Sequence, residues 1–349
     1  MKALNREKIK KILVVRTDRM GDVLLNVPAI RALKASFKAT IVMLADAGLK
    51  DLLQGIEEID AILPFEEGKW HKSISWRLSL LRQIRQERFS LAVMLNPSRR
   101  FHILSYMARI PLRLGYDRKW SFLLTHKIKD NKYEGKKHEV EYNLDLVRSI
   151  GADTDDKKIN INIDKEDARF VQGLLEKNAI GDKDPLVAIQ PNSSNPAKCW
   201  PRENFAQVAD ELYQRFSTQV AIIGAGEDRG SAIKLISLTK HQPINLCGNL
   251  TLRQLAAFLR RCTLLISNDS GPVHIAAAVN TATCVIFGRN IPGVSPRRWG
   301  PWGNSNIALH KDPGCNPCLD RNCPYGFKCL KSITPREVLE AAEKQLESR

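Results

Sequence analysis

The fold is decided most clearly by one stretch in the second half of the chain, Leu264-Leu-Ile-Ser-Asn-Asp-Ser-Gly-Pro-Val-His274. Its apolar start predicts the end of a β-strand and its polar middle a turn. A helix should follow from Pro272, because proline fits the first helical turn. Such a junction exposes backbone N–H groups at the positive end of a helix dipole, which attracts phosphate. A well-capped helix that binds nothing is an equally good interpretation. The candidate residues for a sugar phosphate are Asp269, Ser270, Gly271 and His274.

A second junction of this kind lies near the N-terminus. The short β-branched run Ile12–Val15 predicts a buried parallel strand, and Val23–Lys34 has apolar residues at helical spacing. Asp22 then lies at a helix N-terminus and at the carboxyl end of a strand, where open α/β sheets bind ligands. A carboxylate that only interacts with the helix dipole is the plainer alternative.

A third junction follows the expected strand Val187–Ile189. The loop after it contains two hydroxyl groups and a lysine before a helix expected from about Arg202. Ser193 and Ser194 would donate hydrogen bonds to a diphosphate, and Lys198 would add positive charge. A solvated polar loop would have the same composition.

The three junctions belong to two successive runs of alternating strands and helices. The first run has strands expected at 12–15, 40–44 and 91–95, with helices at 23–34, 76–87 and 140–149. The helix expected at 164–177 ends the first run, and the second run has strands at 187–189, 220–223, 244–246, 264–266 and 283–287 and a helix at 335–348. Residues 178–185 are the best linker candidate, and residues 160–163 alternate as an edge strand would. This pattern predicts parallel sheets, and 349 residues suggest two domains.

The charge of the chain limits its partners. A net charge of +16, from 54 Lys and Arg against 38 Asp and Glu, favours nucleic acid, anionic membranes or acidic substrates. No zinc-finger spacing of the Cys2His2 kind and no ribonucleoprotein aromatic pattern is present, so we expect no nucleic-acid partner. Basic residues surround Trp70, Trp76 and Trp120, a mixture that suits lipid headgroups, although partly buried tryptophans would give the same pattern.

The apolar runs of the chain are short. None reaches the roughly 18 residues that a transmembrane helix needs, and the run near the N-terminus is too brief for a signal peptide. We therefore expect the chain to stay in the cytoplasm.

The eight cysteines fall into two groups. Four are scattered in apolar settings and are expected to be core thiols: Cys199, Cys247, Cys262 and Cys284. The other four cluster as Cys315-x2-Cys318-x4-Cys323-x5-Cys329. These thiols are candidates for a structural zinc site or an iron–sulfur cluster, with reduced, packed thiols as the alternative. A metal here would hold a loop in place and take no part in catalysis.

Taken in order, several stretches resemble glycosyltransferase family 9, the ADP-heptose:lipopolysaccharide heptosyltransferases. The resemblance spans nearly the whole chain. The similar stretches are Arg16-Thr-Asp-Arg-Met-Gly-Asp22, Pro28-Ala-Ile-Arg-Ala-Leu33, Arg113-Leu-Gly-Tyr116, His138-Glu-Val-Glu-Tyr142, Lys198-Cys-Trp-Pro201 and Asp269-Ser-Gly-Pro-Val-His274.

The resemblance implies a GT-B fold, an α/β architecture of two Rossmann-like domains whose parallel sheets face each other across a cleft. Residues 1–178 would bind the acceptor, and residues 185–334 would bind the nucleotide sugar and carry the cysteine-rich tail. The last helix, 335–349, would pack back on the first domain. The implied reaction is an inverting sugar transfer that needs no cofactor.

The resemblance also implies roles for single residues. Asp22 would be the catalytic base, Arg16 would hold either this carboxylate or the acceptor, and Arg113 would lie at the acceptor. The expected donor is a nucleoside-diphosphate sugar, ADP-heptose. The acceptor would be a lipid-linked anionic saccharide, the lipopolysaccharide inner core, at the inner face of the cytoplasmic membrane. The implied donor-binding residues are Ser193, Ser194, Lys198, Glu227, Leu250, Asp269, Ser270, Gly271 and His274.

Three other functions stay open at this point. A GT-B sugar-nucleotide epimerase would share the phosphate-binding residues but need no lipid acceptor. A nicotinamide enzyme would need a complete dinucleotide fingerprint, whereas Gly224-Ala-Gly226-Glu-Asp-Arg229 lacks the third glycine. A basic binding protein without catalysis would explain the charge but not the ordered junctions.

Overall fold

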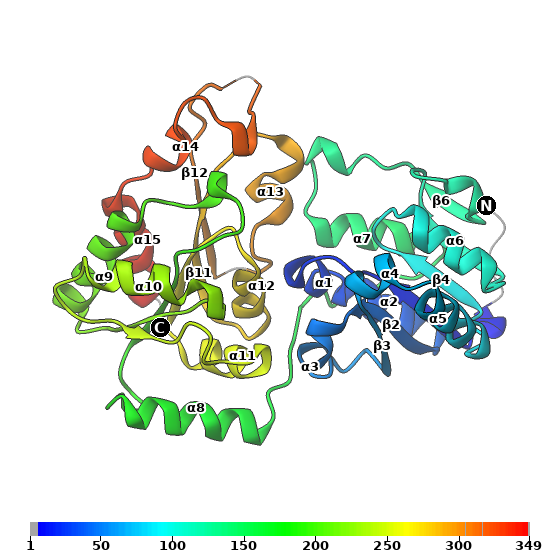
Figure 1. Ribbon diagram of the computed structural model, residues 1–349, viewed down its shortest axis with the longest axis horizontal. Helices are drawn as coiled ribbons and strands as arrows, with labels where there is room; N and C mark the ends of the chain where they lie inside the picture. The colour runs from blue at the N-terminus through cyan, green and yellow to red at the C-terminus, as the bar shows by residue number, and fades with distance from the viewer. Residues whose placement is uncertain (1–5, 304, 316, 348–349) are drawn as a thin grey trace. The chain divides into compact units, whose positions relative to one another are not determined.

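The computed structural model describes residues 6–303, 305–315 and 317–347. The chain forms two compact units, Met1–Asn162 and Ile163–Arg349, each built on one six-stranded sheet with helices around it (Figure 1). Every strand pair is parallel, which confirms the expected α/β architecture of two parallel sheets. The unit boundary falls before the helix at 165–177, so this helix belongs to the second unit, whereas the sequence analysis placed it in the first.

The sheet of the first unit has the strand order β3-β2-β1-β4-β5-β6. Its central strand β1 is buried from Ile12 to Val15, as a parallel strand covered on both faces should be. The order reverses direction between β1 and β4, and such a switch point is where open α/β sheets bind ligands. The strands are β1 (Lys11–Val15), β2 (Thr40–Asp46), β3 (Ala61–Phe65), β4 (Leu91–Met94), β5 (Leu112–Tyr116) and β6 (His126–Ile128).

The helix expected over 23–34 is divided in two. The buried side chain of Asn26 donates to the backbone oxygens of Asp22 and Val23, which ends the first helix, and Pro28 then begins the second. Residues 160–163, expected as an edge strand, are not a strand. The helices of this unit are α1 (Met20–Leu24), α2 (Val27–Phe37), α3 (Lys50–Leu53), α4 (Glu67–Lys72), α5 (Ile74–Gln86), α6 (Arg99–Met107) and α7 (Glu139–Arg148), with 3-10 turns η1 (Arg6–Lys8), η2 (Ala47–Leu49), η3 (Ser121–Leu123) and η4 (Lys132–Glu134).

The tryptophans of the first unit differ in their surroundings. Trp70 and Trp76 pack their rings against Phe65, with centroids 5.8 and 5.6 Å away, so both belong to the edge of the hydrophobic core. Trp120, in contrast, is exposed. A lipid-facing position therefore stays a prediction for Trp120 alone.

The sheet of the second unit has the order β12-β11-β10-β7-β8-β9, with β7 and β10 at its centre. Its strands are β7 (Leu186–Gln190), β8 (Gln219–Ile222), β9 (Ile244–Asn245), β10 (Leu264–Asn268), β11 (Ala282–Phe287) and β12 (Asn306–His310). Its helices are α8 (Lys165–Lys177), α9 (Arg202–Phe216), α10 (Arg229–Ile236), α11 (Leu252–Arg261), α12 (Gly271–Ala278), α13 (Pro296–Trp299), α14 (Lys328–Lys331) and α15 (Pro335–Glu347), with 3-10 turns η5 (Pro196–Lys198), η6 (Gly226–Asp228), η7 (Pro292–Val294) and η8 (Asp320–Asn322).

The last helix, α15, packs within the second unit against α9, β10 and β11 (Figure 1). Its apolar face, which includes Val338 and Ala342, joins the core that contains Trp200 and Phe205. The indole N–H of Trp200 donates to the carbonyl of Ile333 at 2.9 Å, just before the helix begins. This corrects the expectation that the helix returns to the first domain. Within the described residues, no helix combines the length and apolar character needed to cross a bilayer.

Candidate functional site

The first polar cluster lies where β1 ends. Arg16, the residue after this strand, is buried, and its guanidinium contacts three carboxylates. Its Nη2 lies 3.3 Å from Asp22 Oδ1, its Nε 2.9 Å from Asp18 Oδ2, and its Nη1 3.3 Å from Glu139 Oε1. Asp22 lies in the first turn of α1, with a side chain 19% exposed. The structure thus brings together Arg16 and Asp22, as the sequence predicted, and adds Asp18 and Glu139.

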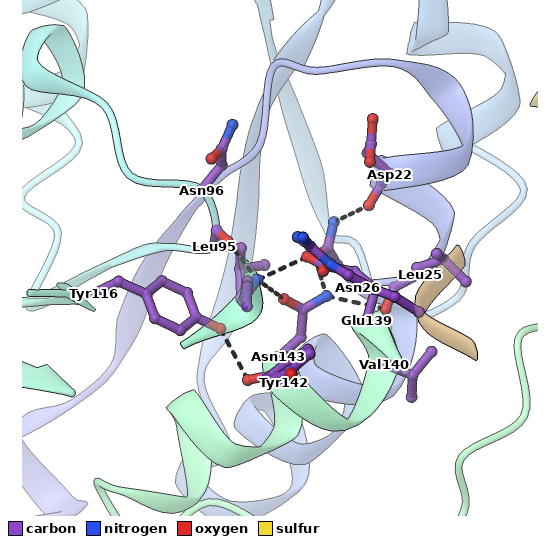
Figure 2. A network of polar contacts seen from close by, with 12 residues as sticks. Asp22, Leu25, Asn26, Leu95, Asn96, Tyr116, Glu139, Val140, Tyr142 and Asn143 are labelled. Atoms are coloured by element: carbon purple, nitrogen blue, oxygen red, sulfur yellow. Dashed lines mark hydrogen bonds and ion pairs between the residues drawn. The ribbon is translucent and has the colours of Figure 1, made fainter. Parts of the chain in front are cut away.

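A buried network of polar side chains contacts Arg16 through Glu139. Glu139 accepts a hydrogen bond from Lys132 Nζ at 2.6 Å, and Lys132 also donates to Asn143 Oδ1 at 3.1 Å. Asn143 in turn donates to Asn26 Oδ1 at 2.8 Å, which connects α7 to the start of α2 (Figure 2). Buried ions need such partners, because an unpaired charge in the interior is costly. The network holds the Arg16 guanidinium in one position.

The charges around Asp22 make it a stronger base than an ordinary aspartate. Burial raises the pKa of Asp22, and the neighbouring Arg16 opposes this only in part. Burial also lowers the pKa of Arg16, but the attraction of Asp22, Glu139 and Asp18 outweighs that effect and raises it overall. Arg16 is therefore a permanent cation beside a carboxylate that accepts protons more readily than usual.

A cavity of about 270 Å³ opens beside this cluster, at the carboxyl ends of β1 and β4. Asp18 forms part of its wall and accepts a hydrogen bond from Asn96 Nδ2 at 2.6 Å. Arg113, the second predicted acceptor residue, is not among the residues that line it. The cavity is lined by Arg16, Asp18, Asn96, Ser98, Arg100 and Lys119, among others.

The second polar cluster lies in the second unit, at the carboxyl ends of β7, β10 and β11. Lys198 Nζ lies 2.6 Å from Asp269 Oδ2, and Arg289 Nη2 lies 3.1 Å from the same oxygen. Lys198 also donates to the backbone oxygen of Asp269 at 3.3 Å. The structure thus joins Lys198 to Asp269 across 71 residues of sequence and adds Arg289, which the sequence analysis did not identify. Arg289 had no local signal beyond its place after a predicted strand.

The hydroxyl groups predicted for this cluster come from two parts of the chain. Ser270 is the N-cap residue of α12, and its hydroxyl lies 3.1 Å from that of Ser267. Gly271 begins the helix, and His274 is buried one turn later. Ser193 and Ser194 lie in the loop after β7, where Ser194 is exposed. A helix start, two cations and hydroxyl donors together suit an anionic group.

Two glycines fix how closely the loops of this unit approach each other. A Cβ at Gly288, the residue before Arg289, would lie 2.2 Å from the carbonyl oxygen of Ala197, so only glycine lets this chain pass the loop that carries Lys198. Gly248 has φ +74°, and its Cβ would lie 2.7 Å from Gly226 Cα. This contact places the segment before Leu250 beside the turn that carries the exposed Glu227.

The four clustered cysteines do not form a metal site in the structure. Among residues 6–303, 305–315 and 317–347, no three His, Cys, Asp or Glu side chains are placed to hold an ion together. Cys329 is buried beside the core, while Cys315, Cys318 and Cys323 are partly exposed. The geometry therefore does not support the structural zinc that the spacing suggested, and packed, reduced thiols account for Cys329.

If the four thiols do hold a metal, protein purified without added metal should contain about one zinc or iron per chain, and Cys318→Ser should lower both the metal content and the melting temperature. Elemental analysis and thermal unfolding measure the two quantities. A wild type without zinc or iron would leave packed, reduced thiols as the interpretation of the four cysteines.

Two parallel sheets of this kind, each with a charged cluster at its carboxyl edge, have the arrangement in which open α/β proteins bind ligands. Residues 77–328 match the model of glycosyltransferase family 9 (heptosyltransferase), which is more than half of the chain. The chain belongs to this family and is a glycosyltransferase.

Similar proteins extend the match to the rest of the chain. The lipooligosaccharide heptosyltransferase 2 of Campylobacter jejuni is 27% identical over 96% of this chain and 98% of its own length. A glycosyl transferase family 9 structure from Veillonella parvula has a TM-score of 0.88, with 24% identity and 100% of both chains covered. The structure of E. coli ADP-heptose lps heptosyltransferase II has a TM-score of 0.79, with 23% identity, and covers 97% of this chain and 99% of its own. These likenesses confirm the predicted GT-B fold.

Proposed function

We propose that this protein moves a heptose from ADP-heptose to a hydroxyl group of the lipopolysaccharide inner core, with inversion at the anomeric carbon. The observation that carries the proposal is the group formed by Lys198, Asp269 and Arg289 at the start of α12. Two cations and backbone N–H groups converge there, as stabilisation of a leaving diphosphate requires. The names of the similar proteins supply the sugar and the acceptor.

The second unit would act on the leaving group. The bond between the anomeric carbon and the diphosphate oxygen breaks, and negative charge develops on that oxygen. Lys198 and Arg289 would neutralise it, while Ser193, Ser194 and Ser270 would donate hydrogen bonds. Glu227 and Leu250, on neighbouring turns, would contact the nucleoside.

The first unit would act on the acceptor. As the acceptor oxygen bonds to the anomeric carbon, its proton passes to the carboxylate of Asp22. The raised pKa of Asp22 brings it closer to the working pH, where a general base is most effective. Arg16, held by Glu139, would keep the carboxylate oriented and in place. Arg113 would contact a more distant part of the acceptor.

The other functions fit less well. A sugar-nucleotide epimerase would need no second substrate, and the relatives that match across 93–97% of this chain include heptosyltransferases 2 and 3. A binding protein without catalysis has no need to bury a permanent cation beside a carboxylate of raised pKa. We further propose that the enzyme works in the cytoplasm at the inner face of the membrane, since the expected acceptor is lipid-linked, and that it binds no nucleic acid.

The proposed function is tested by a panel of ADP-, UDP-, GDP- and CMP-sugars in a thermal-shift measurement, with NAD(H) as a control, followed by a transfer assay. ADP-heptose should raise the melting temperature most, and only it should release ADP in the presence of the inner-core acceptor. A larger shift with a UDP-sugar, or turnover without an acceptor, would favour the epimerase.

Lys198→Ala should weaken ADP binding by about 1.5–3 kcal/mol, the usual value of a hydrogen bond to a charged group. Isothermal calorimetry measures the affinity. Lys234→Ala, at an exposed position of α10 in the same unit, is the matched control and should bind ADP as the wild type does. Equal ADP affinity in both variants would show that Lys198 only pairs with Asp269.

A further inference from the structure

Four large apolar side chains of the first unit lie exposed close to one another in the sequence and the fold. Phe122 is 73% exposed, and the other three are Tyr106 at 55%, Met107 at 51% and Trp120 at 46%. They come from the end of α6 and from η3, and we call them the Trp120 surface. Exposed apolar side chains that lie together often mark an interaction site, whereas single exposed ones are ordinary.

A chain of contacts makes this surface continuous. The guanidinium carbon of Arg113 lies 5.5 Å from the ring centroid of Tyr106, and its Nε donates to the carbonyl of Leu123 at 2.7 Å. The N–H of Leu123 donates to the carbonyl of Trp120 at 3.2 Å. The rings of Trp120 and Phe122 have centroids 5.8 Å apart. Arg113 thus lies between the two groups of rings.

The surface is strongly basic. Residues 106–130 contain six Lys and Arg and two carboxylates, of which Asp130 pairs with Arg118 at 3.2 Å and Asp117 is exposed. Asp117 is already engaged by Lys127 Nζ at 2.9 Å and by the Ser121 hydroxyl at 2.6 Å. The basic residues are Arg109, Arg113, Arg118, Lys119, Lys127 and Lys129, and all but Arg113 are exposed.

The backbone holds Trp120 in an unfavourable conformation. Lys119 and Trp120 have φ angles of 52° and 62°, in the left-handed region that favours glycine. The buried His102 fixes this turn through Nδ1, which lies 2.8 Å from the carbonyl oxygen of Lys119. Non-glycine residues persist in such conformations where the surrounding structure enforces them, often at functional sites.

The position of Lys119 links this surface to the candidate site. Lys119 lines the cavity beside Asp18 and Arg16, and its Nζ donates to the carbonyl of Pro97 at 3.2 Å. A substrate held next to Trp120 would therefore lie close to the cavity.

We propose that the Trp120 surface binds the interface of an anionic lipid bilayer, with the rings of Trp120 and Phe122 inserted among the headgroups and the surrounding lysines and arginines against lipid phosphates. Aromatic rings prefer this layer, and basic residues beside them are attracted by its negative potential. The proposal rests on the proposed function, because a lipid-linked acceptor explains why a membrane surface lies beside the acceptor cavity.

The test uses the full chain and vesicles that contain phosphatidylglycerol, with pure phosphatidylcholine vesicles for comparison. The double variant Trp120→Ala/Phe122→Ala should lower the partition coefficient about tenfold or more, since two rings lose their apolar burial. Its melting temperature and ADP affinity should match those of the wild type. Tyr213→Ala, which removes an exposed ring of the second unit, is the matched control and should bind vesicles normally.

A second measurement locates the ring. Brominated phosphatidylglycerol should quench the fluorescence of the wild type but much less that of Trp120→Phe, which keeps an apolar ring and should still bind. Wild-type binding should also weaken as salt rises. Equal partition of the double variant and the wild type, or equal quenching of wild type and Trp120→Phe, would overturn the proposal, as would binding to an oligonucleotide without binding to vesicles.

A transfer assay with a water-soluble, delipidated acceptor separates this proposal from the proposed function. If no sugar is transferred while vesicle binding still depends on Trp120 and Phe122, the proposed function fails and the docking surface stands. If transfer proceeds while the double variant binds vesicles normally, the docking surface fails and the proposed function stands.

Discussion

Asp22→Asn is expected to lower kcat by about 10²–10⁴-fold, because a general base accelerates enzyme reactions by this factor. The variant keeps the shape of the side chain and one acceptor oxygen for Arg16 but cannot take the proton of the acceptor hydroxyl. Binding of ADP, in the second unit, should be unchanged. Steady-state kinetics with a saturating acceptor, together with calorimetry for ADP, distinguishes a lost base from a lost fold.

Asp18→Asn is the control for this result. Asp18 touches the same guanidinium as Asp22, at 2.9 Å, and lines the neighbouring cavity. We expect a much smaller loss of kcat in this variant. Should Asp18→Asn be the slower enzyme and Asp22→Asn remain within a factor of a few of the wild type, the roles assigned to these two carboxylates would have to be exchanged.

The same assignment predicts how the rate depends on pH. A base works when deprotonated, so kcat should fall as the pH drops through the pKa of Asp22, which burial has raised. Arg16 opposes that shift. Arg16→Met should therefore move the acid limb of the profile to higher pH.

Glu139→Leu is expected to destabilise the first unit by about 3–5 kcal/mol, because it leaves Lys132 and Arg16 buried without their shared partner. The Glu139 side chain is 1% exposed, and both cations contact its Oε1, at 2.6 and 3.3 Å. Urea unfolding measures the loss. ADP affinity should not change, since the donor cluster lies in the other unit.

Glu141→Leu is a matched control on the same helix. Glu141 also pairs with two cations, Lys157 and Arg148, but its side chain is 26% exposed. A pair open to solvent contributes about 0–1 kcal/mol. Equal losses in the two variants would mean that burial does not govern the stability of this network.

The sequence predicted the buried strands of both sheets well. Runs such as Ile12–Val15 and Val187–Ile189 are β-branched and short, and both form central strands. The edge strands β3, β6 and β12, and β5 next to an edge, were missed, because partly exposed strands lack a continuous apolar run. Lys198 and Asp269 stood out because each follows such a central strand.

What the sequence did not reveal depends on contacts between distant residues. Glu139 approaches Arg16 across 123 positions, and nothing local distinguishes a buried glutamate from the surface glutamates beside it. Arg289 joins Asp269 only because Gly288 lets the chain pass the Ala197 carbonyl. The prediction of where α15 packs was wrong for a related reason. The apolar stripe of this helix shows that one face is covered, but not which unit covers it.

The carboxylate of Asp269 also means that the proposed donor site already contains an anion before any nucleotide arrives. Lys198 and Arg289 both pair with one oxygen of this carboxylate, so an incoming phosphate must compete with Asp269 for the two cations. A monoanion offers these cations no more charge than Asp269 does, whereas a diphosphate does. In the proposed site a pyrophosphate would therefore compete with the Asp269 carboxylate better than a monoanion such as chloride would.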